Sequence, residues 1–158
     1  MTLVLDARQL AAIRQHGEAD YPYEACGLIG GHAGGRSGRG EGGDRKVAVQ
    51  LVPLSNARLD SRRNRYLIAP EAFRGAEALL VRDGLEVLGV YHSHPDHPAV
   101  PSEFDREHAW PWLSYVIVGI ARGRAEDARS WTLADDRRAF SEEALIIEDR
   151  KVVWQSQS

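Results

Sequence analysis

Apolar residues recur along this chain with two periods, one typical of helices and one typical of strands. A capping-box pattern at Asp6 and Gln9 predicts a first helix that ends before Pro22. Pro70 is well suited to a first helical position, so a second helix is predicted from Pro70 to about Gly84. The residues expected to face inward are Leu10, Ile13 and Gly17 in the first helix and Ala72, Phe73, Ala76, Leu79 and Leu80 in the second.

Shorter apolar or alternating segments predict strands between and after these helices. The expected strands cover residues 25–29, 46–54, 66–68, 85–91, 113–121, 129–133 and 139–147. The 113–121 segment is strongly apolar and β-branched, as expected of a central strand. A short third helix is expected to begin at Ser102 and to end before Pro111. Helices mixed with strands, and no internal repeat, predict a single α/β or α+β domain over residues 1–158.

Glycine is concentrated in one segment. Eight of the fourteen residues from 30 to 43 are glycine, which predicts a flexible loop at 30–44. Part of this segment, residues 34–40, resembles an Arg-Gly nucleic-acid-binding stretch. It holds only two arginines, however, and Glu41 and Asp44 follow closely. We therefore interpret it as a surface loop.

The composition restricts the class of protein further. The chain has 158 residues and 43% hydrophobic content, enough for one domain with a substantial core. A single cysteine excludes an intrachain disulfide and zinc sites built on paired cysteines. A net charge of -3 gives no general attraction to nucleic acid or to an anionic membrane. No signal peptide or membrane span is evident, so we expect a cytoplasmic protein.

The candidate chemistry lies at the end of the 85–91 strand. His92 and His94 are two residues apart, so both imidazoles can point to one face of that strand. Asp105 follows in the first turn of the short helix. Imidazole and carboxylate groups suit zinc where thiolates are absent, and three protein ligands leave one tetrahedral position open, as in catalytic sites.

The spacing of these residues is more specific than any one of them. His92-Ser93-His94-Pro95, followed by Ser102 and Asp105, resembles the JAMM motif of the MPN-plus zinc metallopeptidases. Residues 21–30 look like the first strand of that family, with Glu24 at the position of its glutamate. The resemblance implies a cytidine-deaminase-like three-layer α/β/α fold with one mixed central sheet. It also implies one Zn²⁺ per chain and hydrolysis of an amide or isopeptide bond.

Each motif residue then has an expected role. His92, His94 and Asp105 would hold Zn²⁺, which lowers the pKa of its bound water from 15.7 toward about 7. Glu24 would act as general base, taking the proton of that water and passing it to the leaving amine. Ser102 would donate a hydrogen bond to the oxyanion of the tetrahedral intermediate.

Simpler interpretations exist for several of these residues. Ser102 and Asp105 also form a capping box, which is compatible with the catalytic interpretation. Glu24 on its own would be a surface carboxylate, and Cys26 is expected to be a small buried residue rather than a nucleophile.

Other polar and aromatic residues near the motif are ambiguous. Asp96 and His97 either orient the ligand imidazoles or are solvated loop residues, of which the second is favoured. Trp110 and Trp112, on either side of Pro111, belong either to the core or to a groove.

The leading functional hypothesis is a zinc-dependent peptidase of the small stand-alone bacterial type. Such enzymes resemble peptidases that trim the C-terminal tail of ubiquitin-like sulfur-carrier proteins. The alternatives are an isopeptidase that removes a ubiquitin-like modifier from lysine, and a non-catalytic MPN-like interaction module. No nucleic-acid or membrane partner is expected, and a homodimer is compatible with the sequence.

Overall fold

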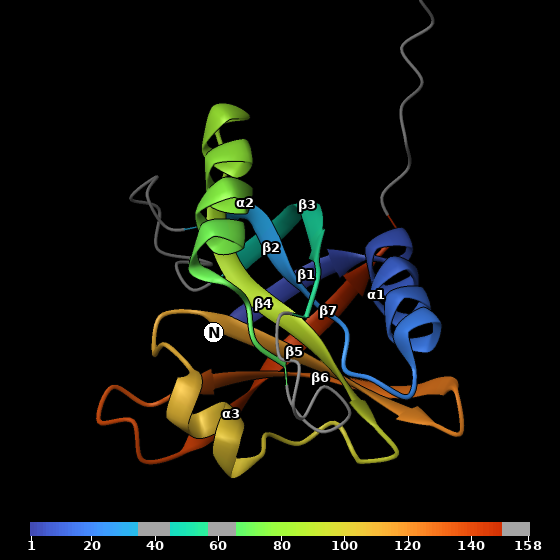
Figure 1. Ribbon diagram of the computed structural model, residues 1–158. Coiled ribbons are helices and arrows are strands. Elements are labelled where there is room, and N and C mark those ends of the chain that lie inside the picture. Colours follow the sequence, from blue (N-terminus) through green and yellow to red (C-terminus); the bar gives the residue numbers. More distant parts are fainter. Residues whose placement is uncertain (35–44, 57–65, 150–158) are drawn as a thin grey trace, which may run out of the picture.

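The computed structural model describes residues 1–34, 45–56 and 66–149, which form three helices and seven strands (Figure 1). In chain order these are β1 (Thr2–Asp6), α1 (Ala7–Asp20), β2 (Cys26–Ala33), β3 (Arg45–Leu54), α2 (Pro70–Arg82), β4 (Glu86–Pro95), α3 (Glu103–His108), β5 (Ser114–Ala121), β6 (Arg124–Leu133) and β7 (Phe140–Glu148). In the described part of the chain, no helix is both long and apolar enough to cross a membrane.

The strands form one mixed sheet that closes on itself. Their order is β1-β3-β2-β4-β5-β6-β7, and β7 pairs with β1 to complete a barrel. The β1/β3, β1/β7 and β4/β5 pairs are parallel, and the remaining pairs are antiparallel. The mixed sheet is confirmed, whereas its closure is a feature that the sequence did not predict.

The first strand was not predicted at all. Leu3, Val4 and Leu5 are fully buried, because β1 lies between β3 and β7. Three consecutive apolar residues without alternation carry no periodic signal, which is why β1 was missed. Asp6 then ends β1 and caps α1: its side chain accepts a hydrogen bond from the Gln9 backbone at 2.7 Å, as predicted.

The second helix begins at Pro70 as predicted and ends at Arg82, two residues before Gly84, whose φ is +75°. Ala76 and Leu80 are buried, but Leu79 is 42% exposed, so the prediction that Leu79 faces inward was wrong. Helix α2 contacts the sheet on one side only, so the stripe it buries is narrower than its apolar composition suggests.

Two loop and strand boundaries also differ from expectation. Strand β2 continues through Ala33, so residues 30–33 are strand and not the beginning of a loop. The rest of the expected loop, residues 35–44, lies outside the described residues. Residues 66–68 do not form the expected strand; they lead into α2 and line a groove instead. Strand β6 begins earlier than predicted, at Arg124.

The core consists of two apolar clusters, one on each side of β4. Ile13 of α1 packs with Tyr91 in the first cluster, and Leu80 of α2 packs with Val90 in the second. Successive residues of β4 thus point to opposite clusters. This packing fixes the strand whose last residues are His92 to Pro95.

Candidate metal centre

Strand β4 carries two of the expected ligands in its own regular geometry. His92 and His94 lie two residues apart on the strand and point to the same side. They are 1% and 6% exposed, and their ring centroids lie 4.9 Å apart in a stacked arrangement. Burial and stacking together bring two imidazoles to one position at the end of the strand.

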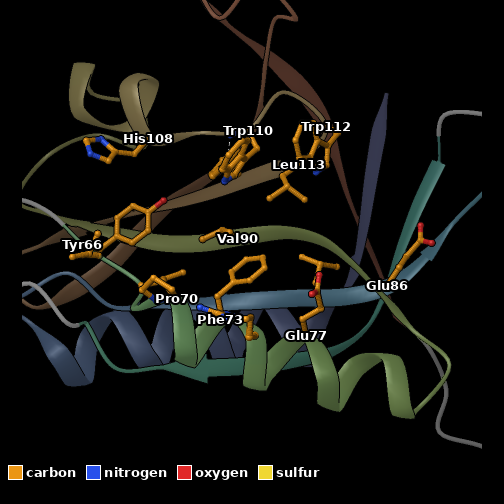
Figure 2. Close-up of a pocket in the computed structure, with 15 residues that line it drawn as sticks. Tyr66, Pro70, Phe73, Glu77, Glu86, Val90, His108, Trp110, Trp112 and Leu113 are labelled. Carbon is orange, nitrogen blue, oxygen red and sulfur yellow. Dashed lines mark hydrogen bonds between the residues drawn. The ribbon is translucent and has the colours of Figure 1, made fainter.

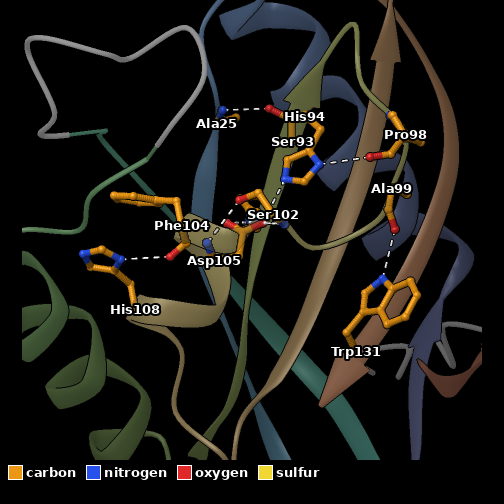
Figure 3. A network of polar contacts seen from close by, with 11 residues as sticks. Ala25, Ser93, His94, Pro98, Ala99, Ser102, Phe104, Asp105, His108 and Trp131 are labelled. Carbon is orange, nitrogen blue, oxygen red and sulfur yellow. Dashed lines mark hydrogen bonds and ion pairs between the residues drawn. The ribbon is translucent and has the colours of Figure 1, made fainter. Parts of the chain in front are cut away.

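The third expected ligand is presented by the start of α3 (Figure 3). The Ser102 hydroxyl accepts a hydrogen bond from the Asp105 backbone at 3.1 Å, and Asp105 Oδ2 accepts one from the Ser102 backbone at 2.7 Å. The same carboxylate lies 3.1 Å from His94 Nε2 and 3.5 Å from His92 Nε2. The capping box is therefore confirmed, and it holds Asp105 against both histidines.

The two imidazoles are oriented in different ways. His94 Nδ1 donates to the Pro98 carbonyl at 3.0 Å, which fixes the ring with Nε2 toward Asp105 Oδ2, 3.1 Å away (Figure 3). Neither nitrogen of His92 has a hydrogen-bond partner among the residues that the structure describes. Its ring instead lies between the ring of His94 and that of Tyr66, whose centroid is 4.4 Å away.

Electrostatics places His92 and Asp105 in the protonation states that a metal requires. Burial lowers the pKa of His92 to about 3, so its imidazole is neutral. Burial acts to raise the pKa of Asp105, but the hydrogen bonds that its carboxylate makes with His94 and with the Ser102 backbone N–H help to outweigh it, and the pKa is lowered to about 2. The three side chains offer ligand atoms within 4.8 Å of one another. A neutral His92 whose buried nitrogens have no hydrogen bonds, beside an ionised Asp105, fits a bound metal ion.

Glu24 is held beside this centre by the pairing of β2 with β4. Cys26 lies opposite His92 in the antiparallel register, and continuing that register brings Glu24, two residues before β2, alongside His94. Glu24 is 3% exposed, and Asn56 donates to its backbone carbonyl at 3.2 Å. This burial excludes the alternative that Glu24, taken on its own, is a surface carboxylate.

Ser93 was not singled out in the sequence although it stands inside the motif. Its hydroxyl accepts a hydrogen bond from the Ala25 backbone at 2.8 Å, and its own N–H donates to the Ala25 carbonyl at 3.0 Å (Figure 3). The segment that follows Glu24 is thus tied directly to the strand that bears the histidines. A motif indicates that a residue is present, but the backbone partner of its hydroxyl is visible only in the structure.

Two residues of the motif loop have structural rather than ligand-orienting positions. Asp96 accepts hydrogen bonds from the Tyr21 hydroxyl at 2.7 Å and from the Arg122 backbone at 2.9 Å. His97 is exposed. The residue that orients His94 is Pro98, through a carbonyl that no side-chain pattern could have indicated.

Cys26 is fully buried, as expected. Burial, and to a lesser degree the charges of Asp20 and Glu24, raise the pKa of its thiol to about 12. Such a thiol is almost entirely protonated at neutral pH and cannot act as a nucleophile.

An apolar groove of about 780 Å³ begins beside the centre (Figure 2). Tyr66 stands at one end of the groove, and Glu77 and Glu86 lie toward the other. Trp110 and Trp112 line it while remaining 52% and 66% exposed. These tryptophans therefore belong to a groove and not to the core, a choice that the sequence left open.

Comparison with known proteins identifies the class. A family model described as prokaryotic homologs of the JAB domain matches residues 6–134, and the chain belongs to this family. It is 32% identical over 144 residues to a desampylase of Haloferax volcanii, covering 89% of this chain and 94% of that protein. It is 38% identical over 116 residues to a probable TtuB-protein conjugate cleaving protease of Thermus thermophilus, covering 73% and 69%. It is also 30% identical over 146 residues to a CysO-cysteine peptidase of Mycobacterium tuberculosis, covering 92% and 90%.

Solved structures agree with this assignment. A protein of Desulfitobacterium hafniense has a TM-score of 0.75 and 30% identity, with 95% of this chain and 94% of that one covered. A JAB1/MPN domain protein of Archaeoglobus fulgidus has a TM-score of 0.52 at 17% identity, with 94% and 97% covered, which shows the fold alone. The family resemblance seen in the sequence, and a hydrolase of this family as the enzyme class, are therefore confirmed.

Proposed function

We propose that this protein is a zinc-dependent peptidase that cleaves an amide or isopeptide bond at the C-terminus of a ubiquitin-like, sulfur-carrier type of protein. The observation that carries the proposal is the buried cluster of His92, His94 and Asp105, preorganised in a member of the JAB family. Of the three relatives described above, one is named a protease that cleaves TtuB-protein conjugates, one a CysO-cysteine peptidase and one a desampylase.

One Zn²⁺ per chain would be held by His92 and His94 through Nε2 and by the Asp105 carboxylate. Two imidazoles and one carboxylate are a ligand set that suits zinc and leaves a position open. When bound, zinc acts as a Lewis acid that makes water acidic enough to ionise near neutral pH. The hydrogen bond from His94 to the Pro98 carbonyl and the cap at Ser102 hold two of these ligands in place.

Glu24 and Ser102 would supply the proton transfer and the stabilisation of developing charge. Glu24 is buried beside the histidine strand, where a carboxylate can accept a proton from water and return it to a leaving amine. The Ser102 hydroxyl accepts a hydrogen bond from the Asp105 backbone, so its own hydrogen remains available for donation. We assign that hydrogen to the oxyanion of the tetrahedral intermediate.

The groove supports a protein as the substrate. It begins at Tyr66, in ring contact with His92, and extends under two exposed tryptophans to Glu77 and Glu86. An apolar surface flanked by basic residues on a ubiquitin-like protein would fit this groove, with its C-terminal tail entering the metal centre. Aromatic residues in such a position are typical of protein interfaces.

An isopeptidase that releases a ubiquitin-like modifier from lysine is the second candidate. The names of the Thermus and Haloferax relatives favour it, because one refers to protein conjugates and the other to a desampylase. A non-catalytic interaction module is disfavoured by the complete ligand cluster and by the burial of Glu24.

Single substitutions test the proposal directly. Glu24→Gln should retain about one zinc per chain and lose activity by at least about 100-fold, because general base catalysis is removed while the ligands remain. His92→Ala should lose bound zinc. Metal content is measured on purified protein, and cleavage is followed by intact mass of a sulfur-carrier protein bearing a C-terminal cysteine, and of a lysine-linked conjugate.

Wild-type protein treated with a chelator, and then resupplied with zinc, is the control for both variants. Normal turnover by Glu24→Gln would contradict its role as base, and full zinc occupancy in His92→Ala would remove that residue from the ligand set. Cleavage of only one of the two substrates separates the peptidase from the isopeptidase.

The remaining expectations stay predictions. We propose that residues 1–158 form one domain of the cytidine-deaminase-like α/β/α type. The protein is further proposed to act in the cytoplasm, as a monomer or a homodimer, without a nucleic-acid or membrane partner.

A further inference from the structure

His92 differs from the other histidine ligand in how its ring is fixed. A metal-binding imidazole usually donates its second N–H to a carbonyl or carboxylate, which sets the orientation of the ring. His94 follows this rule through Pro98. His92 Nδ1 has no hydrogen-bond partner in residues 1–34, 45–56 and 66–149, although the residue is 1% exposed. Something other than a hydrogen bond must hold this ring within the described structure.

Two rings cover His92. The imidazole of His94 stacks on it at 4.9 Å with an interplanar angle of 19°. The phenol ring of Tyr66 lies 4.4 Å away at 41°. Aromatic rings at these separations are in van der Waals contact, and rotation of the ring between them would require both neighbours to move.

Tyr66 has no other assigned role in the centre. It precedes α2 in an irregular segment and contacts His92 from a different part of the chain. Its other side lines the apolar groove, where Figure 2 shows it at one end, below His108. Tyr66 thus forms the wall between the groove and the metal centre.

We propose that Tyr66 is a positioning residue for His92, whose ring contact holds the imidazole with Nε2 turned toward Asp105 in place of the missing hydrogen bond. The proposal rests on the metal centre of the proposed function. It assigns the effect to the ring of Tyr66 and not to its hydroxyl. Phenylalanine should therefore replace tyrosine without loss, whereas alanine should not.

The test compares zinc affinity among variants by competition with a chromogenic chelator. Tyr66→Ala should weaken zinc binding by about 10- to 100-fold, the range found when groups that orient metal ligands are removed. Tyr66→Phe should remain within about twofold of wild type. Phe73→Ala is the matched control, because Phe73 lines the same groove without a ring contact to His92, and it should bind zinc normally.

Two spectroscopic readouts separate positioning from general destabilisation. The visible absorption of the Co²⁺-substituted protein should shift in Tyr66→Ala and not in Tyr66→Phe or Phe73→Ala. In metal-free protein, the His92 imidazole NMR signals should broaden in Tyr66→Ala alone. Unchanged affinity and spectra in Tyr66→Ala would overturn the proposal, as would an equal loss in Tyr66→Phe, which would assign the effect to the hydroxyl.

If circular dichroism shows that Tyr66→Ala is unfolded, Tyr66→Leu replaces it. Leucine retains apolar bulk but cannot cover the flat imidazole face, so weaker zinc binding is expected, and wild-type affinity would contradict the inference. The variant His92→Ala distinguishes failure of the Tyr66 proposal from failure of the proposed function. If His92→Ala loses zinc while Tyr66→Leu binds it normally, the metal centre stands and only the role of Tyr66 is wrong.

Discussion

Ser93 connects the two halves of the candidate centre through a single hydroxyl. It alternates with His92 and His94 along β4 and therefore points to the opposite face, toward Gly17 of α1. From there its hydroxyl accepts the Ala25 N–H, next to Glu24. The histidines and the proposed base are consequently held by one strand pair, and a shift of β2 against β4 would move them apart.

The lone cysteine allows a prediction at the scale of one residue. Because Cys26 is fully buried and its pKa is raised to about 12, the native protein at pH 8 should not react with iodoacetamide. After denaturation one thiol per chain should react, since the sequence contains one cysteine. Mass spectrometry measures both states, and rapid alkylation of the folded protein would contradict the burial.

The same pKa shift predicts how stability depends on alkaline pH. The thiol ionises near 9.0 in the unfolded chain and near 12 in the folded protein, so between these values the folded state binds more protons. The free energy of unfolding therefore falls as pH rises above 9. Between pH 8 and pH 10, wild type should lose about 1 kcal/mol more stability than Cys26→Ala. Urea unfolding at the two pH values measures the difference, and equal losses would show that Cys26 does not contribute.

At this scale the sequence was informative where a residue's own chemistry and spacing defined its role. His92, His94 and Asp105 were predicted as ligands, and the structure brings them together. Tyr66 and Pro98 could not be predicted, because one meets His92 through a ring contact from a distant part of the chain and the other meets His94 through a backbone carbonyl. Neither kind of contact leaves a pattern in the order of residues.

Among the elements, helices α1 and α2 were predicted better than the strands around them. Helix α1 carries its own start signal in the Asp6 and Gln9 capping box, and α2 carries one in Pro70. Strand β1 depends on distant partners, since β3 and β7 cover it from both sides. A strand whose stability comes from such partners has little local signal, whereas a capped helix has a strong one.

Two glycine-to-alanine substitutions test this view of the elements. One is expected to lower the free energy of unfolding and the other to raise it. Gly31 was expected in a loop but lies in β2, where an added Cβ would stand 2.0 Å from the Val47 carbonyl oxygen. Gly31→Ala should therefore destabilise the protein by about 1–3 kcal/mol, since the backbone of β3 cannot move aside. Gly75 lies in α2 with nothing within 4 Å of the added Cβ. Gly75→Ala should stabilise it by about 0.5–1 kcal/mol.

Thermal or urea unfolding measures both changes against wild type. A neutral Gly31→Ala would mean that β2 and β3 are not in the close register described here. A destabilising Gly75→Ala would mean that α2 packs against a further surface at this position.

On the scale of the whole molecule, an apolar groove with exposed side chains lies between α2 and the segment before β5. The described strands form one closed sheet. This arrangement depends on pairing between β1 and β7, at the two ends of the described chain. Local patterns cannot encode such a pairing, which explains why closure was not predicted.

If the groove receives the body of a protein substrate, its exposed aromatic rim should affect recognition and not chemistry. The side chain of Trp112 is 66% exposed. Lys46 donates a hydrogen bond to the backbone carbonyl of Trp112, so the substitution Trp112→Ser leaves that contact intact. The KM for a ubiquitin-like substrate should rise at least about fivefold, as expected when an aromatic contact worth more than 1 kcal/mol is lost, while kcat stays unchanged. Val81→Ser is the control, because Val81 is 63% exposed on α2 but does not line the groove. A rise in KM confined to Trp112→Ser would identify the groove as the recognition surface, whereas equal KM values would place the substrate body elsewhere.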